Sequence, residues 1–195
     1  MRPTTHFHSS LFLLGIIYLS IPEFSWVLGI IFLAGSVLID LDTFLSSVLK
    51  EKNHRLYIFH SLLFWIFMSI IFLVLRFSTL EFFDYFLAFC LGAIWHLLLD
   101  LIDWGLPLLP LHKFRKSYLG ILKEKNLDDK SKDFFLKKYW NSKIIVIIES
   151  LFFALSFLGW FYIPYQLIIE AVCIGLAAYL FFIFEMVTLN KIRNK

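Results

Sequence analysis

Charge and cysteine are both scarce in this sequence. Charged residues make up 17% of the 195 and hydrophobic residues 60%, whereas soluble domains have about a quarter charged and about half apolar. This composition excludes an ordinary soluble domain, because the apolar residues are also clustered in long runs. Cys90 and Cys173 each lie inside an apolar run without a partner at metal or disulfide spacing. We therefore expect neither a disulfide framework nor a cysteine metal site.

Six apolar stretches are long enough, or nearly so, to cross a bilayer, which takes about 17–25 residues. They cover residues 7–21, 24–42, 60–77, 80–103, 144–162 and 165–189. Short connections at Pro22-Glu23, Ser78-Thr79 and Ile163-Pro164 group them into three helical hairpins. The first stretch follows Arg2 as in a signal peptide, but no small-residue cleavage site precedes the second stretch. The sequence therefore predicts an all-α, polytopic membrane protein with about six transmembrane helices.

The basic residues are distributed very unevenly about these stretches. With six spans, both termini and residues 43–59 and 104–143 share one side, and 17 of the 18 Lys and Arg residues lie there. The opposite side holds Arg76. Because Lys and Arg are retained in the cytoplasm, this pattern predicts a multi-pass protein of the plasma (inner) membrane with both termini cytoplasmic.

The chain forms one membrane domain, residues 1–195, in which three parts differ in composition. Residues 1–112 contain four spans and the candidate site, 113–143 are basic, and 144–195 form a C-terminal helical hairpin. In 131–140, lysines alternate with aromatic residues, which suits either a helix in the headgroup layer or a solvated basic loop. The lysines would attract anionic membrane lipids. Nucleic-acid binding is not needed to explain them, and the sequence leaves the oligomeric state open.

Histidines and helix-end aspartates gather on the predicted cytoplasmic side. Ionisable groups within spans are costly and usually mark a functional interior. All six histidines precede residue 113, and four aspartates lie at the same ends of the helices. The set comprises His6, His8, His54, His60, His96, His112, Asp40, Asp42, Asp100 and Asp103.

Helical periodicity indicates which of these residues share a face of their helix. His96, Asp100 and Asp103 share one face of the fourth span, so a His and an Asp could hold one cation, or the Asp could orient the His. Asp40 and Asp42 can both point inward only if the second helix ends there. A core histidine with snorkelling aspartates is the plain alternative.

Two further motifs lie at helix starts. His6 and His8 are two residues apart and cannot share a helical face, so one of them is expected to be a bystander. His60 lies at the start of the third span, and Arg55, five residues before it, carries the donor fork that suits a phosphate. Together, several His and Asp side chains at one depth favour one or two divalent ions. Mixed nitrogen and oxygen ligands favour Zn²⁺, Mn²⁺ or Fe²⁺ over Ca²⁺.

With these residues in place, the chain resembles the YdjM-like family, inner-membrane proteins described as metal-dependent hydrolases and regulated by the SOS repressor in some bacteria. The family shows an N-terminal His, an Asp-x-Asp, a His-Arg followed by a His-Ser, and a His-x-x-x-Asp before a Gly/Pro-rich stretch. The matching residues are His6 or His8; Asp40 and Asp42; His54, Arg55, His60 and Ser61; His96 and Asp100; and 105–110. The chain departs from the pattern in the His54–His60 interval, at Asp103 and before Asp40.

The resemblance implies a metal-dependent hydrolase, and the depth of the site suggests an ester or phosphoester bond in a lipid or lipid-linked substrate. The predicted metal ligands are His6, His8, Asp40, Asp42, His60, His96 and Asp100. Arg55 would hold the anionic group of the substrate, and His54 or Asp103 would act as general base or acid. Two alternatives stay open: a metal-ion or proton-coupled transporter, and a non-enzymatic scaffold with a structural metal.

Overall fold

A computed structural model describes residues 2–40, 60–77, 82–103 and 138–193 of the chain. The long helices are α1 (Pro3–Ser20), α2 (Trp26–Leu38), α4 (Leu62–Arg76), α5 (Phe82–Asp103), α7 (Lys143–Tyr162) and α8 (Tyr165–Arg193). No strand occurs among the described residues, so the all-α prediction is confirmed for that part of the chain.

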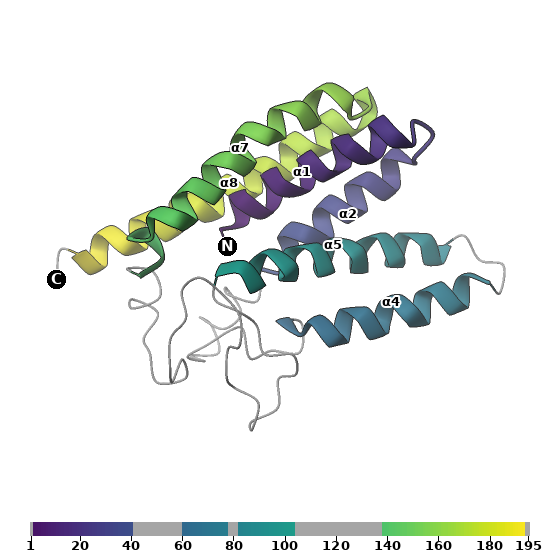
Figure 1. Ribbon diagram of the computed structural model, residues 1–195, viewed down its shortest axis with the longest axis horizontal. Helices are drawn as coiled ribbons and strands as arrows, with labels where there is room; N and C mark the ends of the chain where they lie inside the picture. The colour runs from purple at the N-terminus through teal and green to yellow at the C-terminus, as the bar shows by residue number, and fades with distance from the viewer. Residues whose placement is uncertain (1, 41–59, 78–81, 104–137, 194–195) are drawn as a thin grey trace.

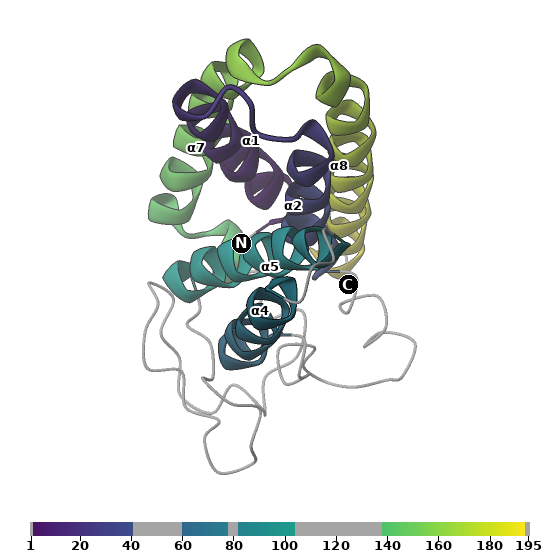
Figure 2. The same ribbon diagram turned by 90° about the vertical axis from the view of Figure 1, so that its right-hand side faces the viewer.

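The helices run up and down along one long axis (Figure 1). α1 packs mainly on α7 and also contacts α2 and α8, whereas α7 and α8 follow one another in the chain without packing closely together. α5 packs between α2 and α4. Viewed along the helices, α1, α2, α7 and α8 surround the upper core, and α5 and α4 lie beneath α2 (Figure 2). α1 begins and α8 ends at the same end of the bundle (Figure 1).

Local sequence sets where several helices begin and end. Pro3 occupies the first turn of α1, where its missing N–H costs nothing. Ser61 and Ser142 cap α4 and α7, and their side chains accept hydrogen bonds from the backbone N–H groups of Phe64 and Ile145. α2 ends at Leu38, earlier than the predicted residue 42, and Asp40 follows in a turn.

The core is divided in two. Phe7, Leu11 and Leu14 of α1 pack with Leu33 of α2 and Leu167 of α8. A second cluster joins α4 and α5 and includes Trp65, Cys90, Ala93 and Leu97. The two clusters meet where α2 packs on α5, so the α2–α5 contact connects the halves of the bundle.

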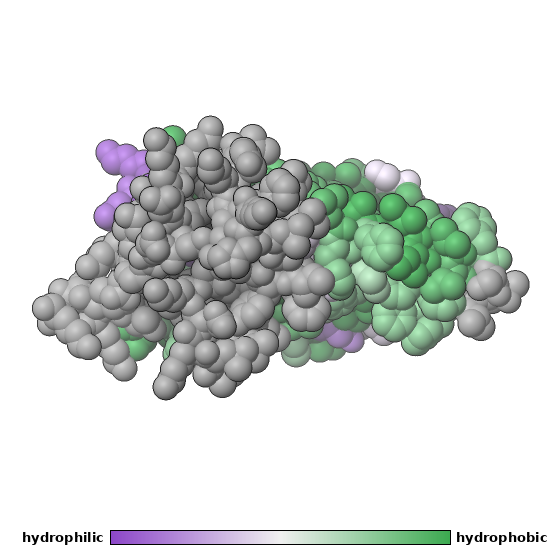
Figure 3. Space-filling view, turned by 90° about the horizontal axis from the view of Figure 1, so that it is seen from below, coloured by the Kyte–Doolittle hydropathy of each residue, from purple (hydrophilic) through white to green (hydrophobic). Residues whose placement is uncertain are grey.

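The outer surface is strongly apolar. Phe67 and Val74 of α4, Ile147 of α7 and Leu180 of α8 are each more than 60% exposed. Seen from the α4 side, hydrophobic residues cover the described helices (Figure 3). Three helical segments, Phe82–Ile102, Lys143–Tyr162 and Tyr165–Phe184, are long and apolar enough to cross a membrane, and α2 and α4 are shorter apolar helices. An exposed surface of this kind suits lipid rather than water.

Candidate metal centre

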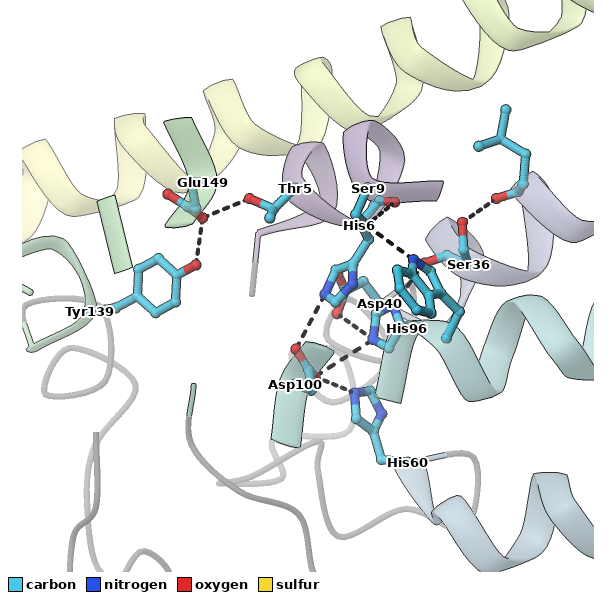
Figure 4. A network of polar contacts seen from close by, with 12 residues as sticks. Thr5, His6, Ser9, Ser36, Asp40, His60, His96, Asp100, Tyr139 and Glu149 are labelled. Atoms are coloured by element: carbon cyan, nitrogen blue, oxygen red, sulfur yellow. Dashed lines mark hydrogen bonds and ion pairs between the residues drawn. The ribbon is translucent and has the colours of Figure 1, made fainter. Parts of the chain in front are cut away.

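Four buried side chains converge at the end of the bundle where α1 begins and α5 ends. His6 comes from the first two turns of α1, Asp40 follows the end of α2, and His96 and Asp100 lie one turn apart on α5 (Figure 4). One ligand atom from each of the four lies within 4.8 Å of the others. Three helices therefore contribute to one group of two imidazoles and two carboxylates.

The distances within the group are short and similar. His6 Nε2 lies 3.2 Å from Asp100 Oδ1 and 4.0 Å from Asp40 Oδ2. His96 Nε2 lies 3.6 Å from an oxygen of each aspartate. The His6 and His96 rings stack with centroids 3.7 Å apart. Two imidazolium ions would repel at that separation, so the stacking suits the neutral rings that bind metals.

These spacings fit the coordination shell of a small divalent ion. Ligand bonds of 2.0–2.2 Å in a tetrahedron place ligand atoms about 3.3–3.6 Å apart. Three of the four separations between His6 or His96 and the aspartates fall within 0.1 Å of that interval, and the fourth is 4.0 Å. A shared cation would explain why imidazoles and carboxylates from separate helices converge at these distances.

The hydrogen bond made by His96 fixes which of its nitrogens faces the group. His96 Nδ1 lies 2.8 Å from the backbone carbonyl oxygen of Ser36. Because a carbonyl can only accept, Nδ1 carries the proton and Nε2 presents a lone pair toward the two carboxylates. This is the arrangement in which metal-binding histidines are held.

The four side chains are buried, and several of their polar atoms have no hydrogen-bond partner among the described residues. His6 and His96 are fully buried, Asp100 is 1% exposed and Asp40 6%. Among the described residues, neither ring nitrogen of His6, nor His96 Nε2, nor Asp40 Oδ2 has a hydrogen-bond partner. Native proteins rarely leave buried polar atoms unpaired. Several such atoms directed at one point indicate a position for a cation.

His60 adjoins this group. It lies immediately before α4, is fully buried, and places Nε2 at 3.6 Å from Asp100 Oδ2. Its ring meets that of His96 edge-on, with centroids 5.6 Å apart. His60 is therefore next to Asp100 and outside the set of four whose atoms all lie within 4.8 Å of one another.

The structure separates His6 from His8. His8 Nδ1 lies 2.9 Å from Ser156 Oγ of α7, and His8 Nε2 lies 2.8 Å from Tyr179 Oη of α8. Two residues on a helix differ by about 200° in direction, so once His6 faces α5, His8 must face α7 and α8. His8, predicted together with His6 as a ligand, is placed away from the group, with both ring nitrogens engaged.

Other predicted site residues are not placed. Asp42, His54 and Arg55 lie outside the described residues, as does the 105–110 stretch. Asp103 ends α5, but its side chain is outside the described part of the chain.

Sequence reasoning missed a second buried polar cluster beside the first. Glu149 of α7 accepts hydrogen bonds from Thr5 Oγ1 at 2.8 Å and from the Tyr139 hydroxyl. Its other oxygen lies 2.9 Å from Arg2 Nη1, and the Arg2 guanidinium lies 3.6 Å from the centre of the Trp140 ring. For residues 131–140 we left open a helix in the headgroup layer or a solvated loop; of its last two residues, Tyr139 donates to Glu149 and Trp140 lies against the Arg2 guanidinium. A single charged residue in an apolar run was the only sequence signal for Glu149.

Comparison with known proteins agrees with this picture. No curated protein matches the chain, and no solved structure does. The model of one family, described as YdjM inner membrane protein, matches residues 1–191. The match covers every described helix except the last residues of α8, and it confirms the resemblance drawn from the His and Asp motifs. The chain belongs to the YdjM inner membrane protein family.

Proposed function

We propose that this protein is a membrane-embedded, metal-dependent hydrolase that acts at the cytoplasmic leaflet on an ester or phosphoester bond of a lipid or lipid-linked substrate. The observation that carries the proposal is the convergence of His6, Asp40, His96 and Asp100, buried and within 4.8 Å of one another. In an apolar bundle, two carboxylates placed together without a cation would be strongly unfavourable.

The donor set limits the choice of ion. Two imidazole nitrogens and two carboxylate oxygens suit Zn²⁺, Mn²⁺ or Fe²⁺, whereas Ca²⁺ sites use oxygen ligands alone. His60, at 3.6 Å from Asp100, could complete the shell of a second ion or orient Asp100. The proposal therefore allows one ion or two.

Each residue of the centre has a proposed role in binding the ion, binding the substrate or transferring protons. His6, Asp40, His96 and Asp100 hold the ion, and the Ser36 carbonyl keeps the His96 ring in the binding orientation. A divalent ion there would supply a water nucleophile near neutral pH and polarise the bond under attack. Arg55 would bind the anionic group of the substrate, and His54 or Asp103 would transfer protons.

The position of the centre supports a substrate at headgroup level. His6 lies three residues from the start of α1, Asp100 three residues from the end of α5, and Asp40 and His60 lie just outside α2 and α4. All four places are at one end of the bundle. Together with the basic residues at that side, this supports six spans with both termini in the cytoplasm.

One specific observation favours a rival function. The set of four has the ligand number of a closed structural site, whereas catalytic sites keep a position open. A non-enzymatic membrane protein with a structural ion would show the same burial. Metal-dependent turnover separates the two functions, and metal uptake into proteoliposomes would indicate a transporter instead.

The first test is the metal content of detergent-purified protein, measured by elemental mass spectrometry. We expect about one or two equivalents of zinc, manganese or iron in the wild type. Asp100→Ala, His96→Ala and His6→Ala should lose metal. His8→Ala is the matched control, because it removes a neighbouring buried histidine that lies outside the group, and it should keep the metal.

The second test is hydrolysis. Purified protein would be assayed against phospholipids in mixed micelles, with each metal and with chelator. Turnover that requires the metal and is absent in Asp100→Ala supports the enzyme. A protein that binds metal but hydrolyses no lipid or phosphoester substrate contradicts it and favours the structural ion. No metal in any preparation, before or after reconstitution, contradicts the centre itself.

A further inference from the structure

The backbones of α2 and α5 touch at two glycines. A Cβ added at Gly92 would overlap the Phe32 carbonyl oxygen and lie 3.0 Å from the Ser36 backbone nitrogen. A Cβ added at Gly35 would overlap the Phe89 carbonyl oxygen and lie 3.1 Å from its carbon. Real side chains do not approach a backbone so closely, so this crossing requires glycine on both helices.

The same crossing leads directly into the metal centre. His96 is one turn beyond Gly92 on α5, about 6 Å along the axis. Ser36 follows Gly35 on α2, and its carbonyl oxygen receives the hydrogen bond from His96 Nδ1 at 2.8 Å. Asp100 is one further turn along α5, and Asp40 follows the end of α2. The glycine contact thus lies one turn from the first ligand on α5.

We propose that Gly35 and Gly92 are positioning residues of the metal centre. By bringing the α2 and α5 backbones into contact, they allow the Ser36 carbonyl to hold His96 with Nε2 toward Asp40 and Asp100. This inference rests on the proposed metal centre and adds the element that sets its dimensions.

The magnitudes favour a positioning role over simple packing. Ordinary carbon contacts begin at about 3.5 Å, so a methyl group 3.0 Å from the Ser36 nitrogen would separate the helices by at least about 0.5 Å. Metal–ligand distances tolerate changes of only about 0.2 Å. Asp40 lies beyond α2, whereas His96 and Asp100 are on α5, so this separation would open the ligand set between its members.

A second glycine contact in the bundle provides a matched control. A Cβ added at Gly15 of α1 would lie 2.5 Å from Gly159 Cα of α7. The crowding is of the same kind, but α7 contributes no ligand to the group, and Gly15 is nine residues, about 13 Å, from His6. Gly15→Ala should therefore cost stability without changing the geometry of the centre.

The test compares Gly92→Ala, Gly35→Ala and Gly15→Ala in detergent, using only monodisperse folded protein. Affinity for Zn²⁺ is measured by competition with a chelator, and the Co²⁺-substituted protein is read by its visible absorption. We expect Gly92→Ala and Gly35→Ala to bind about 10- to 100-fold more weakly, as when a residue supporting a ligand is removed, with a changed Co²⁺ spectrum. Gly15→Ala should match the wild type in both. Wild-type affinity and spectrum in folded Gly92→Ala and Gly35→Ala would overturn the proposal.

A further measurement uses the metal-free wild type, so it does not depend on whether the glycine variants fold. In the metal-free wild type, ¹⁵N resonances of the His96 ring should show a proton on Nδ1, where the Ser36 carbonyl accepts it. If His96 is instead protonated at Nε2, the carbonyl is not holding the ring and the proposal fails. A wild type that binds no metal would contradict the metal centre and this inference with it. A wild type that binds metal no more tightly than Gly92→Ala and Gly35→Ala would contradict this inference alone.

Discussion

Two buried polar clusters lie side by side at the start of α1. They differ in which groups balance the negative charge of their carboxylates. In one, Glu149 is paired with Arg2 and accepts hydrogen bonds from Thr5 and Tyr139. In the other, Asp40 and Asp100 face the imidazole nitrogens of His6 and His96. The first cluster contains a permanently charged arginine, whereas in the second the carboxylates face imidazole nitrogens.

The difference distinguishes a structural cluster from a binding site. In the Glu149 cluster the arginine neutralises the carboxylate within the chain, even though Arg2 Nε and Nη2 have no hydrogen-bond partner among the described residues. The other group, in which His6, His96 and Asp40 have buried atoms that meet no hydrogen-bond partner in the described part of the chain, calls for a ligand to complete it. We therefore expect substitutions in the two clusters to have opposite consequences for stability and for metal binding.

The largest effect should follow Glu149→Ala. It leaves Arg2 largely buried without its carboxylate, which costs about 3–5 kcal/mol of unfolding free energy. Metal stoichiometry in the protein that remains folded should not change. Thermal denaturation of the metal-free protein measures the first quantity and elemental analysis the second. Loss of metal at an unchanged melting temperature would contradict the division between the clusters.

Asp100→Asn should show the reverse. The four ligands of a structural zinc share about 10–16 kcal/mol of binding energy, so losing one costs about 3 kcal/mol, roughly a hundredfold in affinity. The melting temperature of the metal-free protein should stay the same or rise, because one of two neighbouring carboxylates becomes neutral. Chelator competition and thermal denaturation test the two parts. A large loss of metal-free stability with intact affinity would place Asp100 in a structural cluster instead.

Removing the metal with a chelator tests the difference between the two clusters in the wild type and in one variant of each cluster. At a metal concentration of about 100 times Kd, binding stabilises the folded state by about 2.7 kcal/mol. A chelator should therefore lower the melting temperature of the wild type and of Glu149→Gln, and leave that of Asp100→Asn unchanged. An equal response to chelator in all three proteins would show that the ion acts elsewhere.

The smallest effect is expected at Tyr179→Phe. This change removes the hydroxyl that meets His8 Nε2, and a neutral hydrogen bond contributes about 1 kcal/mol to stability. Metal affinity should match the wild type, because His8 faces α7 and α8. A weaker metal affinity would connect His8 with the centre after all, in agreement with its prediction as a ligand.

The sequence predicted the elements better than their contacts. Apolar length and the hairpin turns were sufficient to locate the helices, and the i, i+4 spacing of His96 and Asp100 predicted that they share a face. The choice between His6 and His8 depended on the rotation of α1, which is set by packing of Phe7, Leu11 and Leu14 against other helices. No local pattern carries that information.

The residues that support the metal centre were even harder to predict from the sequence. Glu149 meets Thr5 across 144 positions of sequence, and His96 meets the Ser36 carbonyl across 60. A backbone carbonyl has no side-chain signature at all. Gly35 and Gly92 have no side chain at all, and their relation to the metal centre appears only when the α2–α5 crossing is seen next to the ligands.

The buried first half of α1 has a consequence for biogenesis. Thr5, His6, His8, Ser9 and Ser10 are all buried by other helices, and α1 is not among the three described helices that are long and apolar enough to cross a membrane. The ribosome makes α1 before α5, α7 and α8, the helices that receive its polar side chains. We therefore expect α1 to wait at the membrane surface or beside the insertion machinery, and to take its final place only after α5, α7 and α8 have entered the bilayer.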